Sequence, residues 1–437
     1  MFLRDNLQAL ASSPASTTQQ LRSANMIIPG HIPALDGLRG VAILLVMVYH
    51  FTMAYIHAFS GVLYQVSNVG WCGVDLFFVL SGFLITGILC DAKDDRCYFQ
   101  KFYMRRVLRI FPLYYGFLFV LFAILPLMHH FSPFVRQHMG EQVWLWSYLT
   151  NFDYCLASHD LVIQLHLAHF WSLAVEEQFY LIWPAIIFFT KPKAAMRICS
   201  LCMGVALLLR IMLVMTHANP LIGFNLTPCR MDSLAVGALC ALLVRTNMSV
   251  RKLLKGAGTI TLVAGLAIAF MLCHRGESQS ENPVMQSIGY TILALFFGGV
   301  LLLALYPSKS NFLSWILSCP LLVIFGIYSY GIYVFHAPMT TAFTRWFPVK
   351  TFSAEFHSQS IGLEVHVLCS IFISLLIAVL SWHLYENHFL KLKNRFVLQG
   401  KSGIARENHQ AKSDYISTFG PQRIARELEA WFSRRPF

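Results

Sequence analysis

Residues 38–58 read LRGVAILLVMVYHFTMAYIHA, a run that is almost entirely apolar. At a rise of 1.5 Å per residue, such a helix is long enough to cross the roughly 30 Å hydrocarbon core of a bilayer. Comparable runs recur along the chain, and the one at 231–244 is the shortest. We predict about ten membrane spans, near 38–58, 73–90, 110–128, 171–190, 198–216, 231–244, 257–273, 287–306, 320–342 and 362–386.

The composition agrees with this pattern. Of the 437 residues, 57% are hydrophobic and only 12% are charged, whereas soluble domains carry about a quarter charged residues. A soluble enzyme and a disordered chain are both excluded. We therefore expect an all-α, polytopic integral membrane helical bundle.

The distribution of Lys and Arg predicts the orientation, because basic residues near span ends are retained in the cytoplasm. Placing the amino terminus inside puts most basic residues of the connecting segments on that side, including those of 93–109, 191–197, 245–255 and 391–395. We expect both termini in the cytoplasm: a flexible tail over 1–30, a membrane domain over 31–390 and a basic tail over 391–437. The aromatic, polar segment 129–169 then lies outside, as a lid or a ligand-facing loop.

The first span carries two ionisable residues at membrane depth, where such groups are costly. His50 follows Arg39 by eleven positions, which places both side chains on one helical face about 16 Å apart along the axis. They either line one path into the membrane or are a snorkelling Arg and a buried His that bonds a nearby carbonyl. Asp75, at the start of the next span, is either a helix cap or the group that orients His50.

The segment YFQKFYMRRVLRIFPLYYGF groups Arg105, Arg106 and Arg109 within one helical turn. We predict a short interfacial helix here, ending where Pro112 begins the next span. The arginines form either an ordinary positive-inside collar that contacts anionic lipid or a bidentate site for the phosphates of a cytosolic ligand.

Adjacent carboxylates interrupt the apolar run HFWSLAVEEQFYLIWP. Glu176 and Glu177 point about 100° apart, so one is expected to be structural and one functional, and Tyr180 shares the face of Glu176. Arg230 and His336 also fall in or beside apolar spans, and each alone favours a helix-packing contact.

The chain has eleven cysteines, an odd number without a framework spacing. By the predicted topology Cys155 and Cys229 both lie outside, where they could pair in an oxidising compartment.

These motifs together resemble the membrane acyltransferases of family 3, which O-acylate sugars and other exported molecules. The resemblance is carried by the Arg39-to-His50 spacing and by GVDLFFVLSGFLI, RRVLRIFPLYY, HFWSLAVEEQFYLIWP, CRMDSLAVGAL, YSYGIYVFHAP and the closing YEN. It implies ten core spans, an acyl-CoA donor in the cytosol and an acceptor hydroxyl outside. It ties activity to Arg39, His50, the arginines of RRVLR and the first carboxylate of VEEQFY.

The resemblance leads to a mechanistic hypothesis in which Arg105, Arg106, Arg109 and Arg39 hold the phosphates of acyl-CoA. His50 then acts on the acceptor hydroxyl either as general base or as acyl carrier. Glu176 or Asp75 orients His50 or positions the acceptor. Acceptor binding or structural support is expected of four further residues, Tyr180, Arg230, Glu177 and His336. We expect no metal.

The protein is therefore predicted to be an O-acetyltransferase that uses acetyl-CoA. We expect it in the cytoplasmic (inner) membrane of a bacterium. Its expected partners include membrane lipids but no nucleic acid. The acceptor is a carbohydrate or glycoconjugate, such as lipopolysaccharide or an exported polysaccharide. Acceptor identity, acyl chain and oligomeric state stay open. The alternatives are a transporter or flippase for a lipid-linked or anionic substrate, for which intramembrane Arg, His and Glu are equally expected, and a scaffold without turnover.

Overall fold

A computed structural model describes residues 32–53, 55, 67–128, 131–156, 160–275, 280–306 and 312–396. Regular structure within these ranges is helical, with no strand, which confirms the predicted all-α class. The predicted tail over 1–30, and 397–437 of the predicted carboxyl-terminal tail, lie outside the described residues, so the orientation of the termini stays a prediction.

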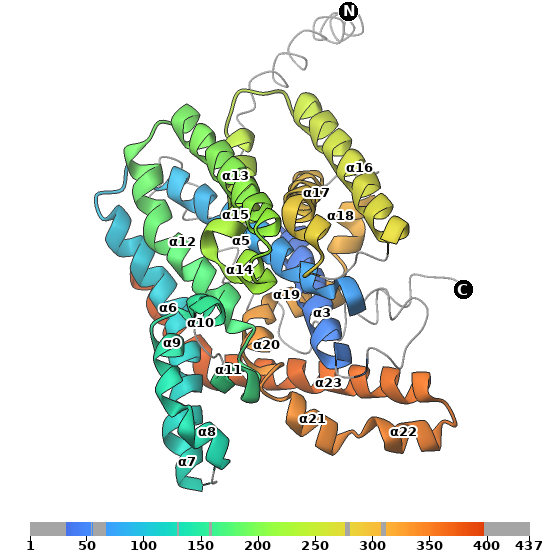
Figure 1. The fold of residues 1–437 in the computed structure, drawn as a ribbon. Coiled ribbons are helices and arrows are strands. Elements are labelled where there is room, and N and C mark those ends of the chain that lie inside the picture. The colour runs from blue at the N-terminus through green and yellow to red at the C-terminus, as the bar shows by residue number, and fades with distance from the viewer. Residues whose placement is uncertain are drawn as a thin grey trace, which may run out of the picture.

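Nine described helical segments are long and apolar enough to cross a membrane. Their principal helices, labelled in Figure 1, are α3 (Pro33–Thr52), α5 (Gly73–Asp91), α6 (Tyr98–Phe119), α12 (Phe170–Phe189), α13 (Pro192–Met215), α15 (Thr227–Val244), α16 (Val250–Arg275), α17 (Tyr290–Ala304) and α23 (Gln359–Ser381).

The predicted tenth span, 320–342, is not one continuous helix. It consists of α19 (Pro320–Ile327) and α20 (Ser329–Phe335), separated at Tyr328. The Ser329 hydroxyl donates to the carbonyl of Gly326 at 2.9 Å, an alternative to helical pairing that short hydroxyl side chains favour at helix ends. The break matters because it lets α20 end inside the protein, close to the end of α3.

Pro112 does not begin a new span, contrary to the prediction. α6 runs from Tyr98 through Pro112 to Phe119, then continues through the π-helical turn η3 (Val120–Ile124) into α7 (Leu125–Met128). An internal proline removes only one backbone donor, and membrane helices tolerate it where neighbouring groups pack around the site. The arginines of RRVLR therefore belong to the spanning helix itself and not to a separate interfacial helix.

The bundle has inner and outer helices. In the most apolar window of the segments containing α5 and α15, 72% of residues are buried, against 17% for α13 and α16. Large side chains such as Leu208 and Phe270 on the outer helices are exposed, as a lipid-facing surface requires. Figure 1 shows α5 and α3 in the interior and α16 at the margin.

Glycines allow the inner helices to approach closely. A Cβ atom at Gly37 would lie 1.7 Å from the carbonyl oxygen of Leu317, and one at Gly326 would lie 1.8 Å from that of Asp36. α3 therefore packs backbone to backbone against α19 and against the short helix α18 (Phe312–Leu317).

Short helices join the spans. Segment 129–169, predicted as a lid or an acceptor-facing loop, contains α8 (Pro133–Gln137), the 3-10 turn η4 (Met139–Glu141), α9 (Gln142–Trp146), α10 (Thr150–Leu156) and α11 (Asp160–Gln164). Others are the 3-10 turn η2 (Gly70–Cys72), α14 (Pro220–Asn225), the π-helical turn η5 (Met285–Gly289), α21 (Thr340–Trp346), α22 (Val349–Glu355), the π-helical turn η6 (Trp382–Glu386), α24 (Asn387–Leu392) and the 3-10 turn η7 (Lys393–Phe396).

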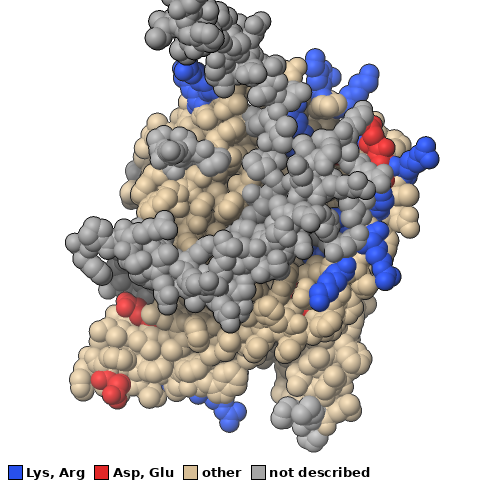
Figure 2. All heavy atoms as spheres, turned by 180° about the vertical axis from the view of Figure 1, so that it is seen from behind, with Lys and Arg blue, Asp and Glu red and all other residues tan. Residues whose placement is uncertain are grey.

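Charge is unevenly spread over the surface. Figure 2 shows Lys and Arg gathered mainly along the upper right margin of one face, while the lower part of that face is mostly neither basic nor acidic. Such a separation is typical of a protein whose middle section lies in hydrocarbon.

Candidate active site

Three histidines from distant parts of the chain meet at the end of α3. His50 lies in the last turn of α3, His336 directly follows α20, and His169 directly precedes α12. The ring centroid of His336 lies 5.0 Å from that of His50 and 5.1 Å from that of His169. We call these residues the histidine cluster. Their position in apolar spans marks His50 and His336 in the sequence, whereas the only signal for His169 is its place at the start of the HFWSLAVEEQFY motif.

The hydrogen bonds of His50 fix its neutral tautomer. Its Nδ1 lies 2.9 Å from the carbonyl oxygen of Val46, which can only accept, so Nδ1 carries the proton. Nε2 then carries the lone pair, and it has no hydrogen-bond partner among the described residues. Because His50 is only partly buried, this nitrogen is suited to take a proton or attack a carbonyl carbon.

His169 is buried and holds the start of α12 against α20. Its carbonyl accepts hydrogen bonds from the hydroxyls of Tyr333 at 2.8 Å and Ser172 at 3.2 Å. Neither ring nitrogen has a hydrogen-bond partner among the described residues, although both are buried. Buried nitrogens of this kind usually bind a water or a ligand.

In the second turn of α3, Arg39 lies close enough to Arg106 and Arg109 of α6 for mutual repulsion. We call these three residues the cationic cluster. Arg39 forms an ion pair with Asp36 at 2.9 Å, and Arg106 lies 5.6 Å from the centre of the Tyr180 ring. Within the described part of the chain, Arg106 and Arg109 donate no side-chain hydrogen bond. Partly buried guanidinium groups with unused donors are suited to a multiply charged anion.

Arg105, predicted as part of the same anion site, points elsewhere. Its Nη1 donates to the carbonyl of Phe396 in η7, at 3.3 Å. The sequence placed the three arginines of RRVLR within one turn, and Arg105 stays near Arg106, but the packing of η7 against α6 gives its guanidinium a backbone partner that Arg106 and Arg109 lack.

The paired carboxylates face different surroundings, as their spacing predicted. Glu176 lies beside Ser81 and Tyr180 and near the cationic cluster. The hydroxyls of Ser81 and Tyr180 are themselves 2.5 Å apart, which links α5 to α12. Glu177 is also near Arg106, but it lies beside four tyrosines as well, Tyr114, Tyr115, Tyr148 and Tyr330. No hydrogen bond joins Glu176 to His50 among the described residues, so the predicted orienting contact is not made.

Asp75 does not orient His50 either. Its Oδ1 accepts hydrogen bonds from Arg230 at 2.8 Å and from the Ser233 hydroxyl at 2.9 Å, and all three residues are buried. The Arg230 guanidinium also lies 4.2 Å from the centre of the Tyr290 ring. Asp75 and Arg230 therefore form an ion pair between α5 and α15. A sequence cannot show this pairing, because it depends on how two helices 155 positions apart face each other.

Cys155 and Cys229 are free thiols. Cys155 donates to the carbonyl of Asn151 at 3.3 Å, and burial raises the pKa of its thiol to about 11. The structure therefore does not contain the disulfide that the sequence left open.

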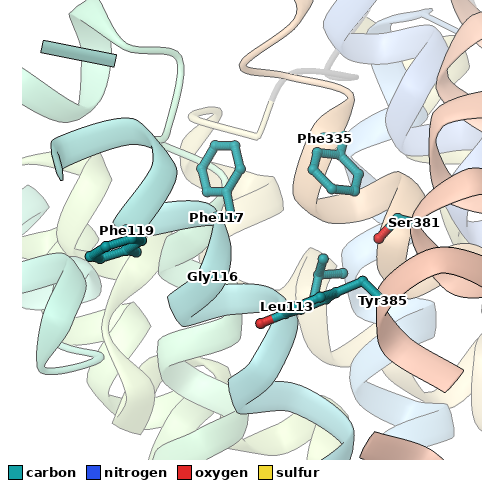
Figure 3. Close-up of a pocket in the computed structure, with 7 residues that line it drawn as sticks. All are labelled: Leu113, Gly116, Phe117, Phe119, Phe335, Ser381 and Tyr385. Carbon is teal, nitrogen blue, oxygen red and sulfur yellow. The ribbon is translucent and has the colours of Figure 1, made fainter. Parts of the chain in front are cut away.

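A pocket of about 340 Å³ opens between α6, α20 and α23 but includes none of the predicted site residues. Figure 3 shows its lining of Leu113, Gly116, Phe117, Phe119, Phe335, Ser381 and Tyr385. Its two hydroxyls are already used, since Ser381 donates to Glu386 at 3.0 Å and Tyr385 to the carbonyl of Pro112 at 3.1 Å. An apolar pocket of this kind is better suited to contact lipid or packed side chains than to bind and activate reactants.

The arrangement has two centres, and α3 connects them. The cationic cluster lies beside the second turn of α3 and the histidine cluster at its last turn, and the eleven residues from Arg39 to His50 correspond to about 16 Å of helix. Such a pair can hold a charged ligand at one end and present a reactive nitrogen to its far end.

The chain matches the model of the acyltransferase family 3 domain over residues 32–383 and thus belongs to this family. It is similar to peptidoglycan O-acetyltransferase OatA of Listeria monocytogenes, at 28% identity over 326 residues, or 72% of this chain and 50% of the relative. It is also similar to O-acetyltransferase OatA of Staphylococcus aureus, at 27% identity over 385 residues, or 85% of this chain and 59% of the relative. The chain thus spans little more than half the length of these relatives. No solved structure matches it.

Proposed function

We propose that this protein is an integral membrane O-acyltransferase that moves an acetyl group from cytosolic acetyl-CoA to a hydroxyl of an extracytoplasmic carbohydrate. The observation that carries the proposal is the placement of an unused imidazole nitrogen and a cluster of guanidinium groups about 16 Å apart along one helix. Membership of the acyltransferase family, and the names of its O-acetyltransferase relatives, support this reaction class.

The cationic cluster is proposed to bind the phosphates of acetyl-CoA. Coenzyme A carries several phosphate charges that cannot enter hydrocarbon, but its long thin arm can lie between helices. Arg106 and Arg109 supply unused donors, and Arg39 adds a third positive charge. Arg105 is left out of the proposed site because its guanidinium is bonded to a backbone carbonyl.

His50 is proposed to act as general base. As the acceptor oxygen attacks the thioester carbon, the hydroxyl proton passes to Nε2 of His50. The carbon–sulfur bond then breaks, and the thiolate of coenzyme A takes the proton back from His50. The products are an O-acetyl ester and coenzyme A with a free thiol, and His50 returns to its neutral form.

Glu176 and Tyr180 lie on the part of α12 that contacts the cationic cluster. Glu176 is near both the cationic cluster and Tyr333, and Tyr333 contacts His169. We propose that this carboxylate and the Tyr180 hydroxyl position the reacting ends of donor and acceptor, and that Glu177 acts in packing among its tyrosines.

The proposed orientation follows the Lys and Arg asymmetry. Both termini and the cationic cluster face the cytosol, and the histidine cluster faces the outside of a bacterial cytoplasmic membrane. The acceptor then reaches His50 from the side of segment 129–169. Peptidoglycan acetylation by a relative, stated in its name, favours a cell-envelope glycan as the acceptor class.

The test is acetyl transfer by purified protein in proteoliposomes that receive radiolabelled acetyl-CoA and a glycan acceptor. Wild-type protein should place label in the glycan, whereas His50→Ala and His50→Gln should lose at least a hundredfold in rate. Retention of the wild-type rate by His50→Ala would remove His50 from the mechanism. Transport of label across the membrane without ester formation would favour the transporter alternative.

A further inference from the structure

We propose that His336 is a positioning residue for His50, holding the positive charge that His50 gains when Nε2 takes the hydroxyl proton. His336 would thereby have the role that a carboxylate has in many catalytic triads, but as a neutral hydrogen-bond acceptor. This inference rests on the proposed function and names a second histidine for the same reaction.

The hydrogen bonds of His336 fix which of its nitrogens is protonated. Its Nδ1 lies 3.0 Å from the carbonyl oxygen of Ile332 and 2.9 Å from that of Tyr333, both acceptors only. Nδ1 therefore carries the proton, and Nε2 carries a lone pair. This Nε2 lies 3.3 Å from Nδ1 of His50.

The facing nitrogens of the two rings have complementary protonation states. Nδ1 of His50 carries a proton because it also faces the carbonyl of Val46, so a donor of His50 meets an acceptor of His336. The proton is shared between Val46 and His336. In this arrangement a hydrogen-bonded chain runs from the carbonyls of α20 through His336 to His50 and leaves Nε2 of His50 for the substrate.

The fold holds His336 firmly in this position. The residue follows the last turn of α20, where the Ile332 carbonyl accepts both the backbone N–H and the ring of His336, and the Tyr333 carbonyl accepts from the ring as well. The side chain is completely buried and packs against Phe51 and His169, with ring centroids 6.2 Å and 5.1 Å away. Two carbonyls on Nδ1 polarise the ring and make its Nε2 a better acceptor.

The other groups around His50 do not supply a negative charge. The titratable side chains that face it are Tyr49 on its own helix, His166 and His169 before α12, and His336 after α20. No carboxylate forms a hydrogen bond or ion pair with His50 among the described residues. When His50 becomes an imidazolium, Val46 and His336 are therefore the acceptors that stabilise it.

The experiment compares wild type with His336→Leu, which removes the acceptor, and His336→Gln, whose side-chain oxygen can replace it. The matched control is His366→Leu. His366 is a buried histidine that also donates to a backbone carbonyl, that of Phe347 at 2.6 Å, but it has no contact with His50. The acetyl transfer rate is measured against pH, together with the KM for acetyl-CoA.

The leucine variant should lower kcat about 10- to 100-fold with an unchanged KM for acetyl-CoA, which is less than the roughly 10²–10⁴-fold that a proton-transferring group itself contributes. Because protonated His50 loses an acceptor, the acid limb of its pH–rate profile should move to lower pH. His336→Gln should recover much of the rate, and His366→Leu should behave as wild type. A leucine variant with wild-type kcat and pH profile would overturn the proposal, as would a change confined to KM.

A second measurement does not depend on the proposed function. Diethyl pyrocarbonate acylates unprotonated imidazole, so its rate of reaction at His50, followed by mass spectrometry against pH, reports the protonation of this ring directly. His336→Leu should shift that midpoint to lower pH even if no acetyl transfer is found. An unshifted midpoint in a variant that unfolds at the wild-type temperature would reject the pairing, whereas failure of wild type to acetylate would reject only the function.

Discussion

The guanidinium of Arg230 lies 2.8 Å from the carboxylate of Asp75, and both side chains are completely buried between α5 and α15. Removing one partner of such a pair leaves an uncompensated charge in the interior. We expect Asp75→Ala to lower the free energy of unfolding by about 3–5 kcal/mol, measured by thermal or denaturant unfolding in detergent.

The control for this substitution is another Asp–Arg pair, which joins the last residue of α5 to Arg245, directly after α15. Asp91 lies 2.7 Å from Arg245, but its side chain is 63% exposed. Asp91→Ala should cost less than about 1 kcal/mol, because the pair is partly solvated and Arg245 keeps its hydrogen bonds to the carbonyls of Ala241 and Gly87. Equal destabilisation by both variants would mean that burial does not control the strength of these pairs. Full stability with lost activity in Asp75→Ala would return Asp75 to the catalytic machinery.

Gly82 and Gly237 set the distance between α5 and α15. A Cβ atom at Gly237 would lie 2.0 Å from the carbonyl oxygen of Val79, and one at Gly82 would lie 2.0 Å from that of Leu234. Gly237→Ala should therefore destabilise the protein by about 1–3 kcal/mol, as overpacking does. Gly204→Ala, on outer helix α13 with no atom within 4 Å, should leave stability unchanged or raise it slightly. The unfolding temperatures of the two variants provide the comparison.

Arg109 should contribute to donor binding more than Arg105 does. Its guanidinium donates no hydrogen bond to the described residues, so Arg109→Gln removes no such bond and should leave the folded structure nearly unchanged. A charge-assisted hydrogen bond is worth about 1.5–3 kcal/mol, and 1.4 kcal/mol is tenfold. We expect the KM for acetyl-CoA to rise at least tenfold in Arg109→Gln with a nearly unchanged kcat. In steady-state kinetics, Arg105→Gln should change KM less than twofold, and an equal rise in both variants would place Arg105 in the donor site as well.

Two exposed thiols allow the proposed orientation to be tested. Cys97 and Cys273 are both exposed, and the predicted topology places them on opposite sides of the membrane. In variants that retain only one of these cysteines, a membrane-impermeant maleimide added to intact spheroplasts should label Cys273 and not Cys97. Permeabilised cells should show labelling of both. The reverse pattern in intact spheroplasts would invert the topology and place the cationic cluster outside.

Much of the fold was accessible from the sequence because a bilayer imposes strong local rules. A span needs an apolar run of a given length, so the runs near 73–90 and 231–244 identified α5 and α15 directly. The rule fails where a helix breaks inside the protein, since composition does not show whether an apolar run is continuous. The run at 320–342 was predicted as one span, and it is broken at Tyr328.

The sequence alone determined which ionisable residues of the candidate site lie at membrane depth. It also determined the helical spacing that places Arg39 and His50 toward the two ends of α3. Tertiary packing decided their partners. In the folded protein Asp75 pairs with Arg230, and Arg105 donates a hydrogen bond to η7. The rings of His336 and His169 contact the ring of His50. The physical reason is the sequence separation of the partners. Helical periodicity relates residues that are a few turns apart in one helix. Hydrogen bonds between helices depend on the relative rotation of those helices, which the packing of the whole bundle sets.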